Sequence, residues 1–235
     1  MAPARNQRRW SMDQAMEILQ KMYGADAQYR SSGQQKAMEY ILEGSAQVLA
    51  ILRTSEGKSL LYLLPCQLPD AGTTMLILPL VVLKAEMQRR CEEAGIQAHV
   101  WEAKSDPMKL QHSPLIIVAV EPAVKPTFSN FLTQLDIANR LDRVVFDECH
   151  LAITAVSYRP AMALLPQLRK LAVQMIFLTG TMPPVMVSRF EEVMLLHGTR
   201  MVRSSTMRRD ISFHVGNCAP NHDFVSDFAV PDAKI

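Results

Sequence analysis

Six short apolar runs, separated by helix-like segments, constrain the fold of this chain more than any other feature. The runs are rich in Val, Ile and Leu and span residues 47–52, 74–79, 97–101, 115–120, 143–147 and 173–179. The segments between them carry apolar residues at helical spacing and span residues 58–66, 81–95, 128–140, 159–172 and 183–198. Strands that are apolar throughout and alternate with helices indicate a parallel sheet covered on both faces. We therefore predict a doubly wound α/β domain over residues 25–215.

The two ends of the chain have a different character. Ser11 and Gln14 have the S-x-x-Q spacing of a capping box, which predicts a helix that begins there and ends near Gly24. A second helix is expected over residues 33–44. We treat residues 1–24 as an N-terminal extension with one helix. Residues 216–235 show no clear periodicity, so we expect a partly disordered tail.

Composition excludes several classes of protein. Hydrophobic residues make up 49% of the chain and charged residues 20%, which is enough apolar material for a sizeable core. The longest apolar runs fall far short of the roughly 18 residues that suggest a membrane span. Cys66, Cys91, Cys149 and Cys218 lie far apart without a CxxC pair, which argues against structural zinc and against disulfides. We expect a soluble, intracellular protein, and its net charge of +2 is no evidence for or against nucleic-acid binding.

Ligands of open parallel sheets bind beyond the carboxyl ends of the strands, so the residues directly after each run are the candidates for a site. The first run leads into "RTSEGKS", where Lys58 and Ser59 could hold phosphates and Mg²⁺ as in a P-loop. The pattern G-x-x-x-x-G-K-[ST] would place glycine at Leu52, and Glu56 stands beside Gly57. Taken alone, this incomplete motif can also be a chance match.

Acids and hydroxyls come directly after two later runs. Asp147 could hold Mg²⁺ and Glu148 could orient or deprotonate a water molecule, although acids at this position also cap helices. Thr179 and Thr181 could sense the phosphate, or could cap the helix expected near residue 183. Together with Lys58, the three strand ends predict a RecA-like NTPase core.

At this point the motifs resemble those of the RecQ-like family of superfamily 2 helicases, and most nearly the telomere-linked RecQ-like helicases of fungi. The similarity runs over about residues 12–215. In chain order, the matching stretches are "YRSSGQQKAMEYIL" for adenine recognition, "RTSEGKSLLYLLP" for motif I, "ILPLVVLKAEMQRR" for motif Ia, "VAVEPAV" for motif Ib, "DECH" for the DEAH box, "YRP", "FLTGTMPP" for motif III and "RRDISFHV".

This resemblance implies an ATP-dependent 3′–5′ DNA helicase that uses ATP and Mg²⁺, binds DNA, and acts in the nucleus in DNA repair and recombination. It implies that Gln34, or Gln35 in a shifted alignment, reads the adenine. Further ATP-binding positions would be Thr54, Ser55, Glu56, Gly57, Lys58 and Ser59, with Mg²⁺ held by Ser59 and Asp147. The catalytic positions would be Lys58, Asp147, Glu148 and His150, and coupling to DNA would involve Pro79, Thr179 and Thr181.

Several departures from the family define an alternative. Family members carry a second RecA-like domain with arginine fingers, and this sequence stops where that domain would begin. The stretch after the DEAH box, residues 151–157, lacks the aromatic side chains that stack on single-stranded DNA. The alternative is therefore a truncated or degenerate helicase copy that binds ATP, and possibly DNA, without unwinding. Glycines are usual at positions 55 and 56, where a carboxylate repels phosphate unless it points to solvent.

Overall fold

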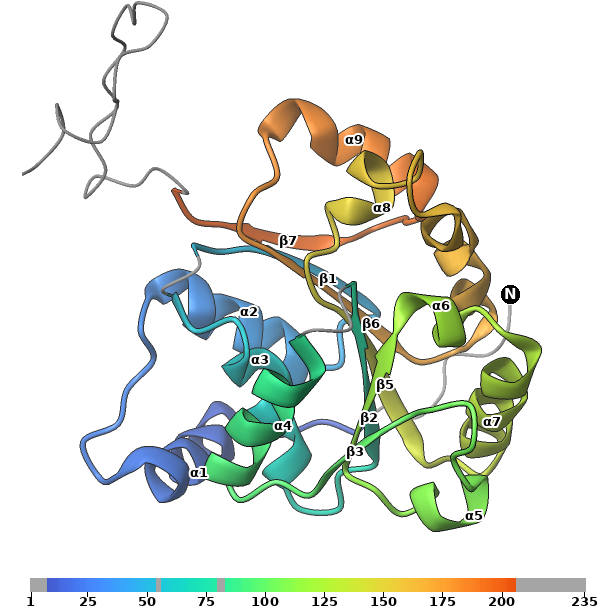
Figure 1. Cartoon of the computed structure of the whole chain (residues 1–235). Coiled ribbons are helices and arrows are strands. Elements are labelled where there is room, and N and C mark those ends of the chain that lie inside the picture. Colours follow the sequence, from blue (N-terminus) through green and yellow to red (C-terminus); the bar gives the residue numbers. More distant parts are fainter. Residues whose placement is uncertain (1–7, 54–55, 80–82, 206–235) are drawn as a thin grey trace, which may run out of the picture.

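The computed structural model describes residues 8–53, 56–79 and 83–205 of the chain. Its centre is one seven-stranded, entirely parallel sheet with the strand order β3-β4-β2-β5-β6-β1-β7 (Figure 1). The strands are β1 (Gln47–Ile51), β2 (Thr73–Leu78), β3 (Ala98–Val100), β4 (Leu115–Ala119), β5 (Leu141–Phe146), β6 (Gln174–Thr179) and β7 (Arg200–Arg203).

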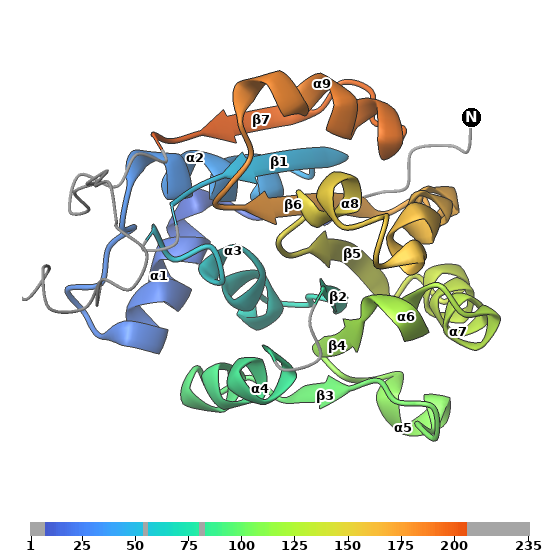
Figure 2. The same cartoon turned by 45° about the horizontal axis from the view of Figure 1, so that its top comes forward.

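Helices cover both faces of this sheet. One face is covered by α1 (Met12–Tyr23), α2 (Ser32–Leu42), α3 (Leu60–Leu63), the 3₁₀ helix η2 (Leu64–Gln67) and α4 (Leu83–Glu93). The other face is covered by α5 (Pro107–Leu110), α6 (Val120–Ala123), α7 (Pro126–Ile137), α8 (Leu151–Thr154), the 3₁₀ helix η3 (Pro160–Lys170) and α9 (Pro184–Val193). Figure 2 shows the same layers with the top tilted forward, with β7 at one edge of the sheet and β3 at the other.

Successive residues of each central strand enter opposite hydrophobic clusters, because side chains alternate across a sheet. In β1, Val48 and Ala50 belong to the cluster under α1–α4, whereas Leu49 and Ile51 belong to the cluster under α5–α9. All five residues of β1 are buried. This two-sided burial explains the continuous apolar stretches of the central strands, such as Val48–Ile51 in β1 and Leu115–Ala119 in β4.

The predicted doubly wound α/β architecture is confirmed, and all six predicted strands are present. The short edge strand β7 was missed because it begins and ends with arginine and buries only Val202. The segment predicted as a helix over residues 159–172 is a 3₁₀ helix that contains Pro166, which has no backbone N–H for a regular helix. The expected helix over residues 58–66 is divided between α3 and η2, with Pro65 near the start of η2.

The N-terminal helix forms as predicted. Ser11 and Gln14 make both hydrogen bonds of the capping box at the start of α1. Ala15 and Leu19 of this helix pack into the same hydrophobic cluster as α2 and β1. The boundary at residue 24 remains a prediction, and the tail predicted for residues 216–235 lies outside the described residues.

Cys66, Cys91 and Cys149 are free thiols, whereas Cys218 lies outside the described part of the chain. Within that part, no group of three His, Cys, Asp or Glu side chains could hold a metal ion. None of its helices has the length and apolar character needed to cross a membrane.

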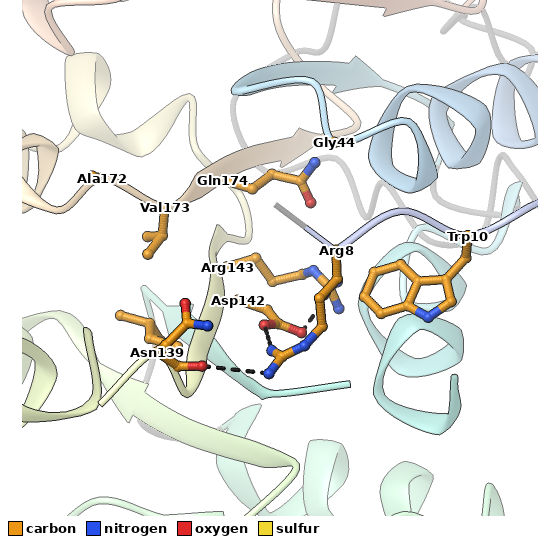
Figure 3. Close-up of a pocket in the computed structure, with 10 residues that line it drawn as sticks. Arg8, Trp10, Gly44, Asn139, Asp142, Arg143, Ala172, Val173 and Gln174 are labelled. Carbon is orange, nitrogen blue, oxygen red and sulfur yellow. Dashed lines mark hydrogen bonds and ion pairs between the residues drawn. The ribbon is translucent and has the colours of Figure 1, made fainter. Parts of the chain in front are cut away.

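A polar pocket lies at the amino-terminal ends of β5 and β6 (Figure 3). The side chains that line it connect the N-terminal segment to the sheet. Arg8 pairs with Asp142 and also donates to the carbonyl of Asn139. Arg143 is almost fully buried, lies 3.8 Å from the same carboxylate and faces the ring of Trp10. Two guanidinium groups therefore share one carboxylate here, at the end of the sheet opposite to the strand ends that carry the sequence motifs.

Candidate nucleotide-binding site

The three motif-bearing strand ends are neighbours in the sheet. Strand β6 lies between β1 and β5, so their carboxyl ends meet at one edge. The backbone N–H of Leu52 donates to the carbonyl of Thr179 at 2.9 Å, and the N–H of Cys149 donates to the carbonyl of Leu178 at 2.9 Å. These hydrogen bonds extend the strand pairing into the loops. They join the phosphate-loop segment, the DEAH box and the threonine motif into one structure.

In the phosphate-loop segment, Gly57, Lys58 and Ser59 turn directly into α3. Gly57 has a φ of +67°, a left-handed conformation that glycine adopts without steric cost. The Lys58 side chain is nearly buried, and its Nζ donates to the carbonyl of Leu52 at 3.3 Å. Ser59 occupies the N-cap position of α3 without using its hydroxyl as a cap. Thr54 and Ser55, which were also predicted to bind ATP, lie outside the described residues.

Gln34 connects the predicted adenine motif to this loop. Its side chain is buried, whereas Gln35 is exposed, so Gln34 is the glutamine that faces the loop. The Gln34 Nε2 donates to the carbonyl of Gly57 at 2.8 Å, and its Oε1 accepts from the backbone N–H of Arg30 at 2.7 Å. Both ends of the amide are thus engaged within the protein. Contact with adenine remains a prediction.

The direction of Glu56, which the sequence leaves open, is inward. Glu56 is only 6% exposed. Its Oε2 accepts the backbone N–H of Arg53 at 3.0 Å, and its Oε1 lies 3.4 Å from the Arg53 Nη2. Instead of pointing to solvent, the carboxylate folds back onto the start of the loop. Arg53 was not singled out from the sequence, since no pairing of these two side chains follows from their spacing in a loop.

The DEAH box begins where β5 ends. Burial, reinforced by the negative charge of Glu148, raises the pKa of Asp147 to about 6. A hydrogen bond from His150 holds the pKa of Glu148 below its usual range, although burial opposes it. Two adjacent carboxyl groups therefore differ in acidity. Glu148 also has a φ of +46°, which is uncommon for a residue with a side chain and occurs often at functional sites.

His150 links the DEAH box to the threonine motif. Its Nδ1 lies 2.9 Å from the Thr179 Oγ1, 3.3 Å from the Thr181 Oγ1 and 3.4 Å from the Glu148 Oε2. The sequence also allowed the acids of the DEAH box, or the two threonines, to cap the helices that follow them, and the structure shows neither arrangement. The N-cap residue of α8 is His150 and that of α9 is Pro183, and neither makes a side-chain cap bond. The side chains instead form a network between the two motifs.

Two other contacts support the same edge of the sheet. Arg203 of β7 donates to the carbonyl of Met182 at 2.8 Å, next to Thr181. Arg159 of the "YRP" stretch pairs with Glu121 of the "VAVEPAV" stretch, with N–O distances of 2.6 and 3.0 Å. An arginine and an acid in those stretches are visible in the sequence, but their pairing is not.

Pro79, predicted to take part in coupling to DNA, comes directly after β2 and is buried. It lines an apolar pocket together with Asp147 and Glu148, and the Asp147 N–H donates to the carbonyl of Ile77 at 3.1 Å. The end of β2 therefore lies directly beside the DEAH box. Residues 80–82 of the predicted motif Ia lie outside the described residues.

The chemistry of this edge suits a Mg²⁺-bound nucleoside triphosphate. Mg²⁺ typically takes one or two protein oxygens and completes its shell with phosphate oxygens and water, so it does not need a cluster of protein ligands. Asp147 and the Ser59 hydroxyl are donors of that kind. The Lys58 ammonium lowers the pKa of Asp147, an effect smaller than those of burial and of Glu148, so the two groups share one electrostatic environment. The residues present thus fit the group that the motifs imply.

The fold and this edge define a RecA-like domain of the P-loop NTPase kind. The family model for "DEAD/DEAH box helicase" matches residues 31–190, more than half of the chain. The chain therefore belongs to the DEAD/DEAH box helicase family. The ATP-dependent DNA helicase RecQ of Bacillus subtilis (strain 168) is 33% identical over 87 residues, which cover 37% of this chain and 14% of that protein. The chain thus spans a small part of this relative's length.

Solved structures of helicases share the fold. The DUF1998 helicase MrfA bound to DNA matches with a TM-score of 0.64 and 15% identity, covering 85% of this chain and 31% of MrfA. MrfA bound to DNA and AMPPNP matches with a TM-score of 0.61 and 17% identity, covering 85% of this chain and 30% of MrfA. The UvsW helicase from bacteriophage T4 matches with a TM-score of 0.55 and 19% identity, covering 83% and 70% of the two chains.

Proposed function

We propose that residues 25–215 form the ATP-binding motor domain of a RecQ-type, 3′–5′ DNA helicase. The observation that carries the proposal is the meeting of Lys58, the Asp147–Glu148 pair and the Thr179–Thr181 pair at adjacent strand ends. Similarity to RecQ over 87 residues supports the RecQ type, and a structural relative crystallised with DNA supports a nucleic-acid substrate.

We assign each side chain a role within this proposal. Lys58 and the backbone around Gly57 bind the phosphates, and Gln34 orients the base through its place beside the loop. Asp147 and Ser59 hold Mg²⁺, which neutralises charge that develops on the phosphates when it is bound. Glu148, kept ionised by its hydrogen bond from His150, accepts a proton from the attacking water.

The network around His150 supports a coupling role. His150 touches both threonines and Glu148, so a displacement of the threonine motif by DNA would reach the proton acceptor. This is a direct chain of hydrogen-bonded side chains. We propose that Thr179 and Thr181 transmit DNA contacts in this way, with Pro79 at the adjoining strand end.

A second candidate is a helicase copy that binds ATP without unwinding. Two observations favour it: α8 and the residues directly after it, up to residue 157, contain no aromatic side chain, and Glu56 stands where the wider family has glycine. Both candidates use the same nucleotide site, so nucleotide binding alone does not separate them.

The test combines nucleotide binding with DNA-stimulated ATP hydrolysis. Titration with a fluorescent ADP analogue and Mg²⁺ should show binding that Lys58→Ala abolishes, because the ammonium supplies the main positive charge of the loop. Glu148→Gln should keep the binding and lose any hydrolysis stimulated by single-stranded DNA. Unchanged affinity in Lys58→Ala would remove this residue from the site. Binding without DNA-stimulated hydrolysis in the unmodified chain would favour the second candidate.

A further inference from the structure

We propose that Arg53 is a positioning residue that neutralises Glu56 and holds its carboxylate away from Lys58, which keeps the phosphate loop able to accept a nucleotide. The inference rests on the proposed nucleotide-binding function and deepens it. It concerns the one acidic side chain in the loop, which sits directly before Gly57, Lys58 and Ser59.

Residue 53 holds the carboxylate of Glu56 through both its backbone and its side chain. Both carboxylate oxygens of Glu56 contact Arg53, one through the backbone N–H at 3.0 Å and the other through the guanidinium at 3.4 Å. The side chain of Glu56 is 7% exposed, whereas that of Arg53 is 41% exposed. A buried carboxylate needs a partner of opposite charge, since an unpaired one carries a large desolvation penalty. Arg53 is that partner.

Lys58 is engaged elsewhere. Its ammonium donates to the carbonyl of Leu52, one residue before Arg53, and not to Glu56. Glu56 and Lys58 are two residues apart in a tight loop, and a carboxylate without a partner attracts the nearest cation. Pairing between them would take the lysine away from phosphate, and a free carboxylate would repel phosphate directly. The backbone N–H of residue 53 holds one oxygen of Glu56, and the Arg53 guanidinium neutralises the carboxylate at the other oxygen, which prevents both outcomes.

A double-mutant cycle separates this role from simple loop stability. If Arg53 matters because it neutralises Glu56, then its loss should be harmless once Glu56 is uncharged. If Arg53 only packs the loop, removing the charge at Glu56 restores nothing. Rescue by a second substitution is therefore the decisive readout.

The experiment is a titration of each purified variant with a fluorescent ADP analogue and Mg²⁺, with an unfolding curve of each nucleotide-free protein. Arg53→Met should weaken binding at least about tenfold, whereas Glu56→Gln should bind within about threefold of the unmodified chain. The double variant should bind within about threefold of Glu56→Gln. Arg53→Lys, which keeps the charge, should also bind well. Arg89→Met removes an exposed ion-paired arginine of α4 and is the matched control.

The results distinguish failure of the inference about Arg53 from failure of the proposed nucleotide-binding function. Unchanged binding in Arg53→Met, or a double variant as weak as Arg53→Met, would overturn the inference and leave the nucleotide site standing. Binding that appears only after Glu56→Gln would also overturn it, since Arg53 would then fail to neutralise the acid. If neither the unmodified chain nor Glu56→Gln binds nucleotide, the proposed function itself fails, and the inference with it. Should Arg53→Met unfold, Arg53→Lys and the double variant are still expected to bind nucleotide about equally well. A double variant that folds but binds at least about tenfold more weakly than Arg53→Lys would overturn the inference.

Discussion

Replacement of Asp147 by asparagine should stabilise the nucleotide-free protein and should reduce the further stabilisation that Mg²⁺ and a nucleotide provide. The pKa of Asp147 is raised from 3.8 to about 6, mainly by burial, so between these two pH values the folded state holds a proton that the unfolded state releases, and above them the folded state carries a destabilised carboxylate. A carboxyl group whose pKa is raised on folding destabilises the protein more as pH increases, and its full cost is present above the folded pKa. Asparagine avoids this cost and can still accept the N–H of Glu148, which lies 2.9 Å from the Asp147 Oδ1.

The magnitude is set by the size of the shift. A difference of roughly 2 pKa units corresponds to about 3 kcal/mol at pH 7.5, and incomplete burial of the side chain reduces this to about 1–3 kcal/mol. At pH 4.5 the unfolded state is still mostly ionised and the folded state is protonated, so the expected gain shrinks to about 1 kcal/mol or less. The gain in stability should therefore grow as pH rises from 4.5 to 7.5.

Urea unfolding of the unmodified chain and of Asp147→Asn, in EDTA and without nucleotide, measures the gain in the free energy of unfolding at pH 7.5 and at pH 4.5. Addition of Mg²⁺ and a nucleotide should then stabilise the unmodified chain and stabilise Asp147→Asn much less. Equal stability of the two proteins at pH 7.5, or a difference independent of pH, would refute the assignment of a raised pKa to Asp147. Equal stabilisation of both proteins by Mg²⁺ would remove Asp147 from the metal site.

Two further substitutions, Gly57→Ala in the phosphate loop and Asp142→Asn at the opposite end of the sheet, separate effects on nucleotide binding from effects on stability. Gly57→Ala should lower the free energy of unfolding by about 1–2 kcal/mol and weaken nucleotide binding about tenfold, because alanine is strained at a φ of +67° and its Cβ would lie 2.8 Å from the Gln34 Nε2. Gly95→Ala is the matched control: its φ is +68° with no atom within 4 Å of a Cβ, so it should cost similar stability and leave binding unchanged. Asp142→Asn should cost about 2–4 kcal/mol in urea unfolding, because Arg143 keeps its buried charge with a weaker partner. Its nucleotide affinity should match that of the unmodified chain, and a loss of affinity would contradict the separation of the two ends of the sheet.

Much of the fold could be predicted from the sequence because a strand that is buried on both faces needs a continuous run of apolar residues. The run over residues 115–120 is apolar at every position, and the run over residues 173–179 is apolar except at Gln174 and Thr179. A sheet covered on both faces requires such runs. The capping box at Ser11 was likewise visible, since it depends on residues three positions apart. Edge strand β7 left no such trace because only one of its residues is buried.

Part of the candidate site could also be predicted from the sequence. The residue types Lys58, Asp147 and Glu148 come after apolar runs, and a parallel sheet places such positions at one edge whatever the order of its strands. The family resemblance rests on the same residues. For Thr54 and Ser55 the expectation remains untested.

Only the tertiary structure decided which of these groups touch. Strand β6 inserts between β1 and β5, and this order brings Thr179 to His150 and to Leu52, residues that are far apart along the chain. The inward turn of Glu56 was equally beyond the sequence, because a loop carboxylate can reach solvent or an arginine with the same spacing. Local patterns determine which segments become strands and helices. Contacts between distant side chains depend on how those segments pack, and here the packing of β1, β5 and β6 sets the site.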